Sequence, residues 1–334
     1  MKPRYDIYAI GNALVDTEVE VSDAFLERLG INKGMMTLVN ESGQQGLAAA
    51  LEQEGQLHRR ASGGSACNTV VAARYFGAST FYACRVADDD TGHFFVDELR
   101  AAGVDTNMAH NKSRGISGKC LVMITPDAER TMHTFLGISE SVGEEAVIES
   151  AVASSRYAYI EGYLVSSPSA RAAAILLRNT AKRYGVKTAL TFSDPAMVNF
   201  FADGLKAMLG DGVDILFCNE REALDFTRCD NIDAALDALK QHANSIAITR
   251  GAHGARLWDG EQVIDVEPVA VKAVDTNGAG DMFAGAFLYA LSQGHDFASA
   301  GRLANAAAAR VVCDFGPRLP AAEHLAIRHE VLGD

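Results

Sequence analysis

The stretch Asp275-Thr276-Asn277-Gly278-Ala279-Gly280-Asp281 decides the interpretation of this chain, and an apolar helical pattern follows it directly. Two glycines with a small residue between them let successive backbone N–H groups converge on one point. The following helix adds its positive N-terminal end, so the segment predicts an anion hole suited to a phosphate. Asp281 lies beside that hole, where a carboxylate can accept a proton from a hydroxyl group. Spacing alone does not separate this from an Asp that merely caps a helix.

Two common phosphate-binding motifs do not occur in the sequence. The P-loop pattern GxxxxGK[ST] is absent, since Gly118-Lys119 is followed by Cys120. The GxGxxG dinucleotide-binding motif is also absent, because the glycine after Gly278 and Gly280 comes only at Gly285. The segment therefore predicts a phosphate site of another kind.

Two shorter segments place further polar groups beside glycines. In Gly63-Gly64-Ser65-Ala66-Cys67-Asn68 the glycines precede a predicted helix, so the backbone can approach a ligand closely, and Asn68 offers a donor and an acceptor. In Gly11-Asn12-Ala13-Leu14-Val15-Asp16, which follows the first predicted strand, Asn12 and Asp16 can bond vicinal hydroxyl groups. Ordinary loop chemistry explains each segment equally well when it is taken alone.

The regular rhythm of the chain after about residue 143 predicts the main fold. Short apolar runs alternate there with helical stretches, which is typical of a parallel sheet covered by helices on both faces. Strand patterns at residues 16–21, 35–40, 118–125 and 130–136 do not fit this rhythm. We therefore predict one doubly wound α/β domain over residues 1–334. A small β-sheet lid, inserted in two pieces at about 14–40 and 112–137, would cover the crevice at the strand ends.

The end of the chain is predicted to be helical. Two Ala-rich helices, near residues 279–292 and 297–313, are expected to close the fold.

Composition limits the kind of partner. Acidic residues outnumber basic ones, 43 against 30, which is the opposite of the balance typical of a nucleic-acid binder. No run reaches the roughly 18 consecutive apolar residues of a membrane span. The six cysteines are scattered without a CxxC pair, which favours reduced thiols and a cytoplasmic location. We expect a small-molecule substrate, no nucleic acid and no membrane.

In this order, the three glycine-containing segments resemble those of the ribokinase or PfkB family of carbohydrate and nucleoside kinases. Residues 63–68 resemble the family's N-terminal signature and residues 275–281 its C-terminal one, and the resemblance covers nearly the whole chain. Asn219-Glu220-Arg221-Glu222 is similar to the family's NxxE motif. The adenosine kinase branch is most similar, through residues 11–16 and Glu161-Gly162-Tyr163-Leu164. The implied fold is a ribokinase-like, mostly parallel sheet with a β-sheet lid.

The resemblance implies transfer of the γ-phosphoryl group of ATP to a hydroxymethyl group. Asp281 would be the base, and Gly278, Ala279 and Gly280 would form the anion hole. Arg130 resembles a lid arginine that reaches the transferring phosphate, although a solvated strand residue explains it too. The residues implied to hold the sugar are Asn12, Asp16, Gly63, Gly64 and Asn68. The residues implied along ATP are Asn219, Thr249, Gly251, Asp275, Thr276, Gly278, Gly280 and Asn305.

The resemblance also implies Mg²⁺ together with ATP. Asn219 and Glu222 would organise that ion mostly through water, which suits its reluctance to lose its hydration shell. A need for K⁺ is left open, as is an oligomer formed through the lid sheet.

The identity of the substrate is predicted from the lid and from one departure. Leu14, Met36 and Leu38 favour an apolar pocket for a base, although lid core explains them too. Where adenosine kinases place an aromatic ring under the purine, this chain has Ala196. Tyr163, Phe135 or Met36 is predicted to compensate for the missing ring.

We therefore predict phosphorylation of the 5′-hydroxyl of adenosine or a related nucleoside. The alternative is a sugar kinase of the ribokinase or fructokinase type. A ligand sensor that has lost activity is the non-enzyme alternative, and the intact Asp281 beside its glycine loop argues against it.

Overall fold

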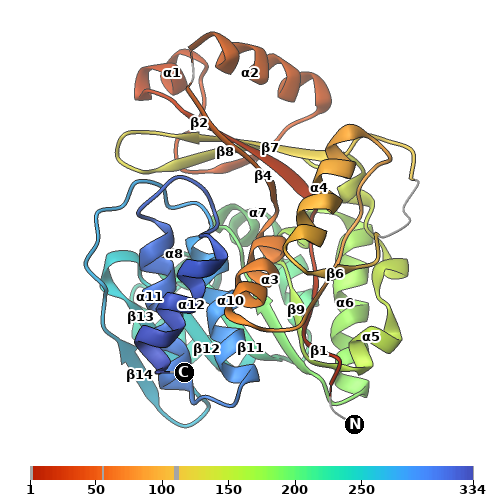
Figure 1. Cartoon of the computed structure of the whole chain (residues 1–334). Coiled ribbons are helices and arrows are strands. Elements are labelled where there is room, and N and C mark those ends of the chain that lie inside the picture. Colours follow the sequence, from red (N-terminus) through yellow and green to blue (C-terminus); the bar gives the residue numbers. More distant parts are fainter. Residues whose placement is uncertain (1–2, 55, 109–112, 334) are drawn as a thin grey trace.

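Two β-sheets organise the chain in the computed structural model, which describes residues 3–54, 56–108 and 113–333 (Figure 1). The large sheet is parallel apart from the antiparallel pairings of its last two strands. Its spatial order is β14 (Val263–Val266), β13 (Ala255–Trp258), β12 (Ala243–Thr249), β11 (Val213–Asn219), β10 (Lys187–Thr191), β9 (Ser155–Ile160), β1 (Tyr5–Ile10), β5 (Thr80–Ala83) and β6 (Asp105–Thr106).

Helices cover both faces of this sheet, as predicted. Alternate residues of β1 enter two separate cores, because successive side chains of a strand point to opposite faces. Ile7 and Ala9 join one core, and Tyr8 and Ile10 join the other. The first core packs against α3 (Ser65–Phe76), α4 (Asp90–Ala101), α10 (Ala279–Ser292), α11 (Phe297–Val311) and α12 (Ala321–Leu332). The second packs against α5 (Glu149–Ala153), α6 (Pro168–Arg183), α7 (Pro195–Leu209), α8 (Glu220–Thr227) and α9 (Ile232–Leu239).

The helix α12 corrects the prediction that two Ala-rich helices close the chain. It buries His324 and Ile327, and the His324 ring packs edge-on against Phe76 of α3 with ring centres 4.8 Å apart. Charged residues interrupt the apolar pattern of α12, so the sequence signal for a buried helix is weak. The helix is buried because α3 lies beside it.

The small sheet forms a separate layer above the strand ends of the large one (Figure 1). Its order is β3 (Met36–Leu38), β8 (Arg130–Phe135), β7 (Gly118–Ile124), β2 (Leu14–Glu20) and β4 (Gln56–Gly63). The edge strand β4 was not predicted, so the range 14–40 for the first lid piece is too short. Its segment QLHRRASG lacks an apolar alternation, and antiparallel pairing with β2 makes it a strand. Lys112, the start of the second predicted piece, lies outside the described residues.

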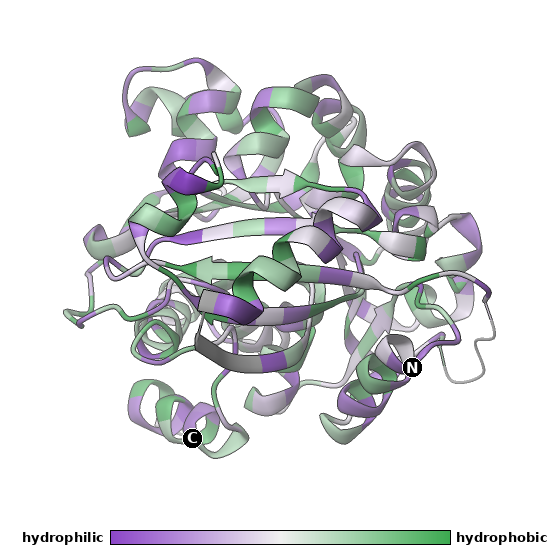
Figure 2. Cartoon of the chain, turned by 90° about the horizontal axis from the view of Figure 1, so that it is seen from above, coloured by the Kyte–Doolittle hydropathy of each residue, from purple (hydrophilic) through white to green (hydrophobic). Residues whose placement is uncertain are grey.

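The outer face of the small sheet is covered by its own helices, α1 (Asp23–Arg28) and α2 (Glu41–Glu54) (Figure 1). Phe25, Leu47 and Leu51 of these helices pack with Leu121 and Met123 of β7. Figure 2, seen from above, shows hydrophilic and hydrophobic residues interleaved along the elements of this side. An oligomer formed through the lid sheet stays a prediction.

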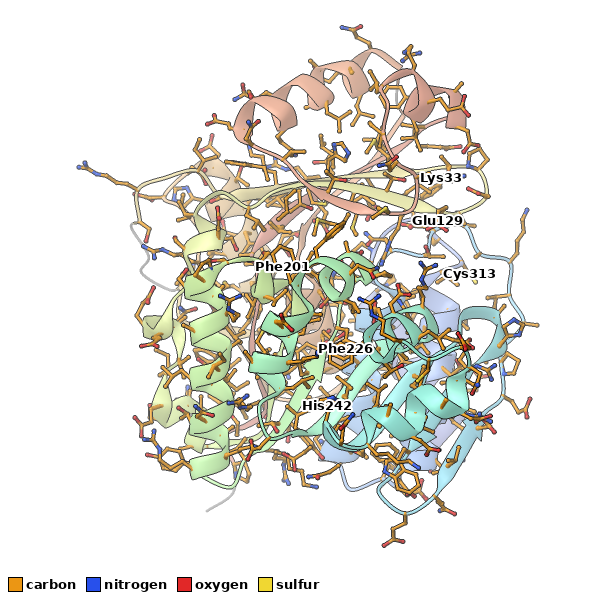
Figure 3. The ribbon with its side chains drawn as sticks, turned by 180° about the vertical axis from the view of Figure 1, so that it is seen from behind. Lys33, Glu129, Phe201, Phe226, His242 and Cys313 are labelled. Atoms are coloured by element: carbon orange, nitrogen blue, oxygen red, sulfur yellow. The ribbon has the colours of Figure 1, made fainter. Side chains whose placement is uncertain are left out.

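An ion-pair cluster ties the lid together. The Lys33 ammonium lies 2.7 Å from Asp23 of α1 and 2.7 Å from Asp127 in the turn between β7 and β8. Figure 3 shows Lys33 in this layer, with Phe226 and His242 in the α/β body below it.

In the described part of the chain, no helix is both long and apolar enough to cross a membrane.

Candidate active site

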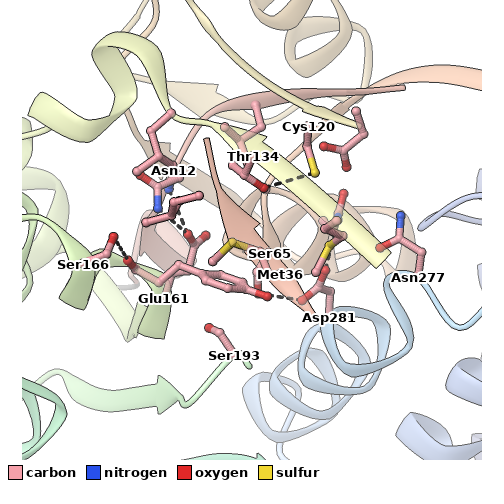
Figure 4. A pocket seen from close by; sticks show the side chains of 18 of the residues that line it. Asn12, Met36, Ser65, Cys120, Thr134, Glu161, Ser166, Ser193, Asn277 and Asp281 are labelled. Atoms are coloured by element: carbon pink, nitrogen blue, oxygen red, sulfur yellow. Dashed lines mark hydrogen bonds between the residues drawn. The ribbon is translucent and has the colours of Figure 1, made fainter. Parts of the chain in front are cut away.

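A pocket lies between the carboxyl edge of the large sheet and the inner face of the lid (Figure 4). It brings together residues that the sequence places up to 269 positions apart, from Asn12 to Asp281. The predicted residues that line it are Asn12, Leu14, Asp16, Met36, Leu38, Gly64, Asn68, Arg130, Tyr163 and Asp281. Lining residues to which the sequence analysis gave no role are Ser65, Cys120, Met132, Thr134, Leu136, Glu161, Ser166, Ser193 and Asn277.

Asp281 is held by the start of α3. The Ser65 hydroxyl donates to its Oδ1 at 2.6 Å (Figure 4). The Asn68 amide donates to its Oδ2 at 3.0 Å. Burial raises the pKa of Asp281, while these two hydrogen bonds and the charges of Arg130 and Arg318 oppose the rise. The two signature segments thus meet at one carboxylate, which is oriented and remains accessible from the pocket. Ser65 was missed because a serine at a helix start is usually explained as a cap.

The segment predicted to form the anion hole lies at the N-terminus of α10. Gly278 precedes the helix with φ +75°, and a Cβ there would lie 2.5 Å from Pro317 Cα, so only glycine fits. The first intrahelical bond of this turn runs from Met282 N–H to Gly278 O at 2.8 Å. The N–H groups of Gly280 and Asp281 lie in the first turn, where a helix offers them no partner of its own. The dipole of α10 also favours an anion at this end.

Asp275 has a different place from the one predicted, while the predicted contact of Thr276 with ATP stays a prediction. Asp275 is fully buried, and its two oxygens accept the N–H groups of Asn277 at 2.8 Å and Gly316 at 2.9 Å. It therefore shapes the glycine loop instead of facing a ligand. The Thr276 hydroxyl donates to Ala128 O of the lid at 3.3 Å, which joins the loop to the turn between β7 and β8.

Arg130 points from β8 into the pocket. Its Nη1 donates to Thr276 O at 3.5 Å, beside the anion hole. Burial alone would lower the pKa of Arg130, but the neighbouring Tyr163, Asp194 and Asp281 outweigh it and raise the pKa. The guanidinium is therefore enclosed among acidic groups, and the interpretation of Arg130 as a solvated strand residue is wrong.

Asn12 is fixed by a buried acid, Glu161. Glu161 Oε1 accepts from the backbone N–H and the side-chain amide of Asn12, each at 3.1 Å (Figure 4). Its Oε2 accepts from Ala66 N–H at 2.8 Å. Burial raises the pKa of Glu161 to about 7, against the effect of those N–H donors. Glu161 thus joins the ends of β1 and β9 to the start of α3. Glu161 lies in the segment that resembles adenosine kinases, but the sequence alone did not indicate its role.

Asp16 faces the pocket from β2 and is 6% exposed. Within the described residues, no side chain or N–H group hydrogen-bonds its carboxylate. Burial raises the pKa of Asp16 strongly, and the neighbouring Glu18 adds to the rise. Gly63 does not line the pocket; a Cβ there would collide with the Asp16 carboxylate, so its role is to let β4 approach β2. Asp16 is therefore available to accept hydrogen bonds from ligand hydroxyls.

The lid wall of the pocket is mainly apolar. Leu14, Met36 and Leu38 line it as predicted, and Met132 and Leu136 add to it. The prediction for Phe135 is wrong, because Arg130, Met132 and Thr134 of β8 face the pocket and the two-residue period turns Phe135 to the other face. Ala196 is buried in the core from the first turn of α7, and Ser193, with φ +71°, reaches the pocket instead.

The residues predicted along ATP lie on the same edge of the large sheet. Asn219 and Thr249 are paired in register at the ends of β11 and β12, and Gly251 is exposed in the 3₁₀ turn Gly251–His253. The Asn305 amide donates to Glu267 O at 2.8 Å. Among the described residues, none of these four lines the pocket that holds Asp281. Their contact with ATP stays a prediction.

Asn219 and Glu222 form a helix cap. The Glu222 oxygens accept from the backbone N–H of Asn219 at 2.9 Å and from its amide at 2.8 Å, and Glu222 N–H donates back at 2.8 Å. Burial raises the pKa of Glu222 to about 8. In the part of the chain that the structure describes, no three His, Cys, Asp or Glu side chains form a metal cluster. These residues suit an ion held through water, and they do not form a direct set of metal ligands.

This geometry defines a class of protein. An oriented carboxylate beside a helix N-terminus and an arginine, at the strand ends of an α/β sheet and under a lid, is the arrangement of a small-molecule kinase. The chain belongs to the pfkB family of carbohydrate kinases, whose family model matches residues 35–324.

Three comparisons illustrate the relationship. The structure of adenosine kinase from Sinorhizobium meliloti superimposes with a TM-score of 0.92 at 33% identity, covering 98% of this chain and 99% of that one. A probable sugar kinase from Rhizobium etli CFN 42 gives 0.92 at 31%, with 98% of both chains covered. The adenosine kinase of Saccharomyces cerevisiae is 27% identical, over 94% of this chain and 96% of its own length. The chain is a kinase with a ribokinase-like fold.

Proposed function

We propose that this kinase transfers the γ-phosphoryl group of ATP to the 5′-hydroxyl of adenosine or a related nucleoside. The observation that carries the proposal is one pocket with two unlike walls. Asp281 and Asn12 of the body and Asp16 of the lid supply polar groups, while the other lining residues of the lid supply a mainly apolar surface of the kind a base needs. Similarity to adenosine kinases of bacterial and fungal origin supports the same substrate class.

Asp281 is the general base in this proposal. The substrate oxygen attacks the γ-phosphorus, the bond from that phosphorus to the bridging oxygen of ADP breaks, and the hydroxyl proton passes to the Asp281 carboxylate. The free N–H groups at the start of α10 and the Arg130 guanidinium stabilise the charge on the transferring group. Ser65 and Asn68 hold the base in one orientation, so little reorganisation is needed during the reaction.

The ribose lies between Asn12 and Asp16. Asp16 accepts from the vicinal hydroxyls, since a carboxylate can accept two such bonds. The Asn68 amide is already engaged with Asp281, so its contribution to the sugar is secondary. The base lies against Leu14, Met36 and Leu38, with Tyr163 as the aromatic surface on the body side.

ATP binds along the ends of β11 and β12, with Asn219, Thr249, Gly251 and Asn305 beside it. Asn219 and Glu222 would hold Mg²⁺ through water, and the ion would neutralise part of the phosphate charge of ATP. The six cysteines are free thiols in the structure, and we propose a cytoplasmic location for the enzyme.

A release assay for ADP over nucleosides and sugars tests the substrate. Adenosine is expected to give the highest kcat/KM, with inosine or guanosine accepted and ribose and fructose poor. The second candidate is a sugar kinase, which the similarity to the Rhizobium etli protein favours. If ribose or fructose exceeds every nucleoside, the sugar kinase replaces our proposal. A protein that binds these ligands but releases no ADP would support the sensor alternative.

A further inference from the structure

The segment between α11 and α12 brings Arg318 to the back of the active site. All three nitrogens of its guanidinium group donate hydrogen bonds. Nε donates to Asn68 Oδ1 at 2.9 Å, Nη1 to Ser62 Oγ at 2.9 Å and Nη2 to Cys67 Sγ at 3.1 Å. Ser62 and Cys67 are fully buried, and Asn68 is 4% exposed. The guanidinium fork of Arg318, formed by these three nitrogens, therefore has defined partners on α3 and on β4.

The chemistry of this contact decides how the Asn68 amide is turned. A guanidinium group has only donors, so the Asn68 atom that faces it must be the carbonyl oxygen. The amide nitrogen then faces Asp281 Oδ2, at 3.0 Å. The reversed amide would set its oxygen against the Asp281 carboxylate and its N–H groups against the N–H groups of Arg318. Only one orientation satisfies both neighbours.

We propose that Arg318 is a positioning residue for phosphoryl transfer, which acts through Asn68 to hold the Asp281 carboxylate in its reactive orientation. This inference rests on the proposed role of Asp281 as the base. Arg318 does not line the pocket and touches neither substrate, so its contribution is to the geometry of the base.

Charge adds a second effect to orientation. The positive charge of Arg318 favours the ionised forms of Asp281 and Asp16, against the effect of burial. The other titratable or charged groups that act on Asp281 come from β2, β8, β9 and the turn after β9: Asp16, Arg130, Tyr159, Glu161 and Tyr163. Without Arg318, less positive charge opposes the effect of burial, and Asp281 takes up its proton at higher pH.

A double-mutant cycle tests the inference, with adenosine and MgATP as substrates. Arg318→Met is expected to lower kcat about tenfold to hundredfold, less than the loss of a base, and to move the acidic limb of kcat/KM to higher pH. Because Arg318 acts through Asn68, it is expected to change kcat less than about threefold in an Asn68→Ala background. If the kcat losses of the two single variants multiply in the double variant, the inference is overturned.

Arg328 offers a matched control, because it is an arginine that also donates a hydrogen bond to α3. Its Nη1 donates to Phe76 O at 2.9 Å, at the opposite end of α3 from Asp281. Arg328→Met is expected to lower the melting temperature with kcat within about twofold of the unmodified enzyme. A folded Arg318→Met enzyme with unchanged kcat and an unmoved acidic limb would overturn the inference.

Two further variants separate the possible failures. If Arg318→Met does not fold, Arg318→Lys keeps the charge without the fork, and its kcat loss is expected to vanish in the Asn68→Ala background. Multiplicative losses there would also overturn the inference. Asp281→Asn is measured in parallel. If it keeps nearly full kcat, the proposed base is wrong; if it is inactive while the cycle is multiplicative, only the role of Arg318 fails.

Discussion

The two walls of the pocket are built on different principles. On the body side, Asp281, Asn12 and Glu161 are joined by hydrogen bonds of 2.6–3.1 Å from Ser65, Asn68 and backbone N–H groups. The lid touches the body near the anion hole through longer contacts, of 3.3 and 3.5 Å, and lines the pocket mainly with apolar side chains.

This difference separates reaction from selection. Short, buried hydrogen bonds hold a reacting group in place before substrate arrives, and such preorganisation is the main source of electrostatic catalysis. Apolar contacts are less directional and depend on contact area, so they select among ligands that differ in apolar surface. We therefore expect variants of the body wall to change kcat and variants of the lid wall to change KM and substrate preference.

The largest effect is expected for Asp281→Asn. The amide has the same shape but cannot take the hydroxyl proton, so kcat should fall by about 10²–10⁴. Calorimetric binding of adenosine should stay nearly unchanged. Near-normal turnover would remove Asp281 from the role of base and would break the assignment of chemistry to the body wall.

Asp16→Asn tests the polar lid residue that is proposed to bind the sugar hydroxyls. Loss of a charged hydrogen bond costs about 1.5–3 kcal/mol, so kcat/KM for adenosine should fall about 10- to 100-fold. The variant and the unmodified enzyme should be nearly equal with 2′,3′-dideoxyadenosine, which has no vicinal hydroxyls. An equal loss with both nucleosides would show that Asp16 acts elsewhere.

Stability at mildly acidic pH reports on the α/β body through His324 of α12. Burial lowers the pKa of His324 to about 4, below the value of about 6.5 expected in the unfolded chain. Between these values the unfolded state binds the additional proton, so the contribution is complete above about pH 6.5 and is lost as pH falls toward 4. The slope is about 1.4 kcal/mol per pH unit.

Urea unfolding of the enzyme and of His324→Phe at several pH values measures this slope. The phenyl ring keeps the packing on Phe76 but does not titrate, so the difference between the two proteins isolates His324. A difference that does not change between pH 4 and 6.5 would contradict the expectation.

The smallest effect is expected for Leu38→Ala. Leu38 lines the pocket and is 42% exposed, so truncation removes apolar contact without opening the core. The variant loses roughly 1 kcal/mol of apolar burial, so KM for adenosine should rise several-fold. The kcat and the activity with ribose should stay unchanged. Leu29→Ala is the control, because Leu29 is also 42% exposed in the lid but does not line the pocket. Equal effects of the two variants would mean that the lid does not select the base.

Prediction from sequence succeeded where the local pattern and the tertiary position agree. The alternation after residue 143 gave the parallel sheet, and the glycines near Asp281 gave the start of α10 at the predicted place. The strand β4 was missed because an edge strand needs no apolar face of its own. Phe135 was misplaced because a shift of one residue along a strand turns the side chain to the other face.

The sequence by itself determined the main parallel sheet, the glycine loop and the identity of the carboxylate beside it, because these depend on backbone freedom and on contacts close along the chain. Only the tertiary structure decided the edge strand β4, the helix α12 and what holds that carboxylate. Ser65 and Arg318 are distant from Asp281 in the chain, and each is a polar residue of a type that occurs on most surfaces. Burial gives them their roles, since a polar group removed from water must find its partner within the fold.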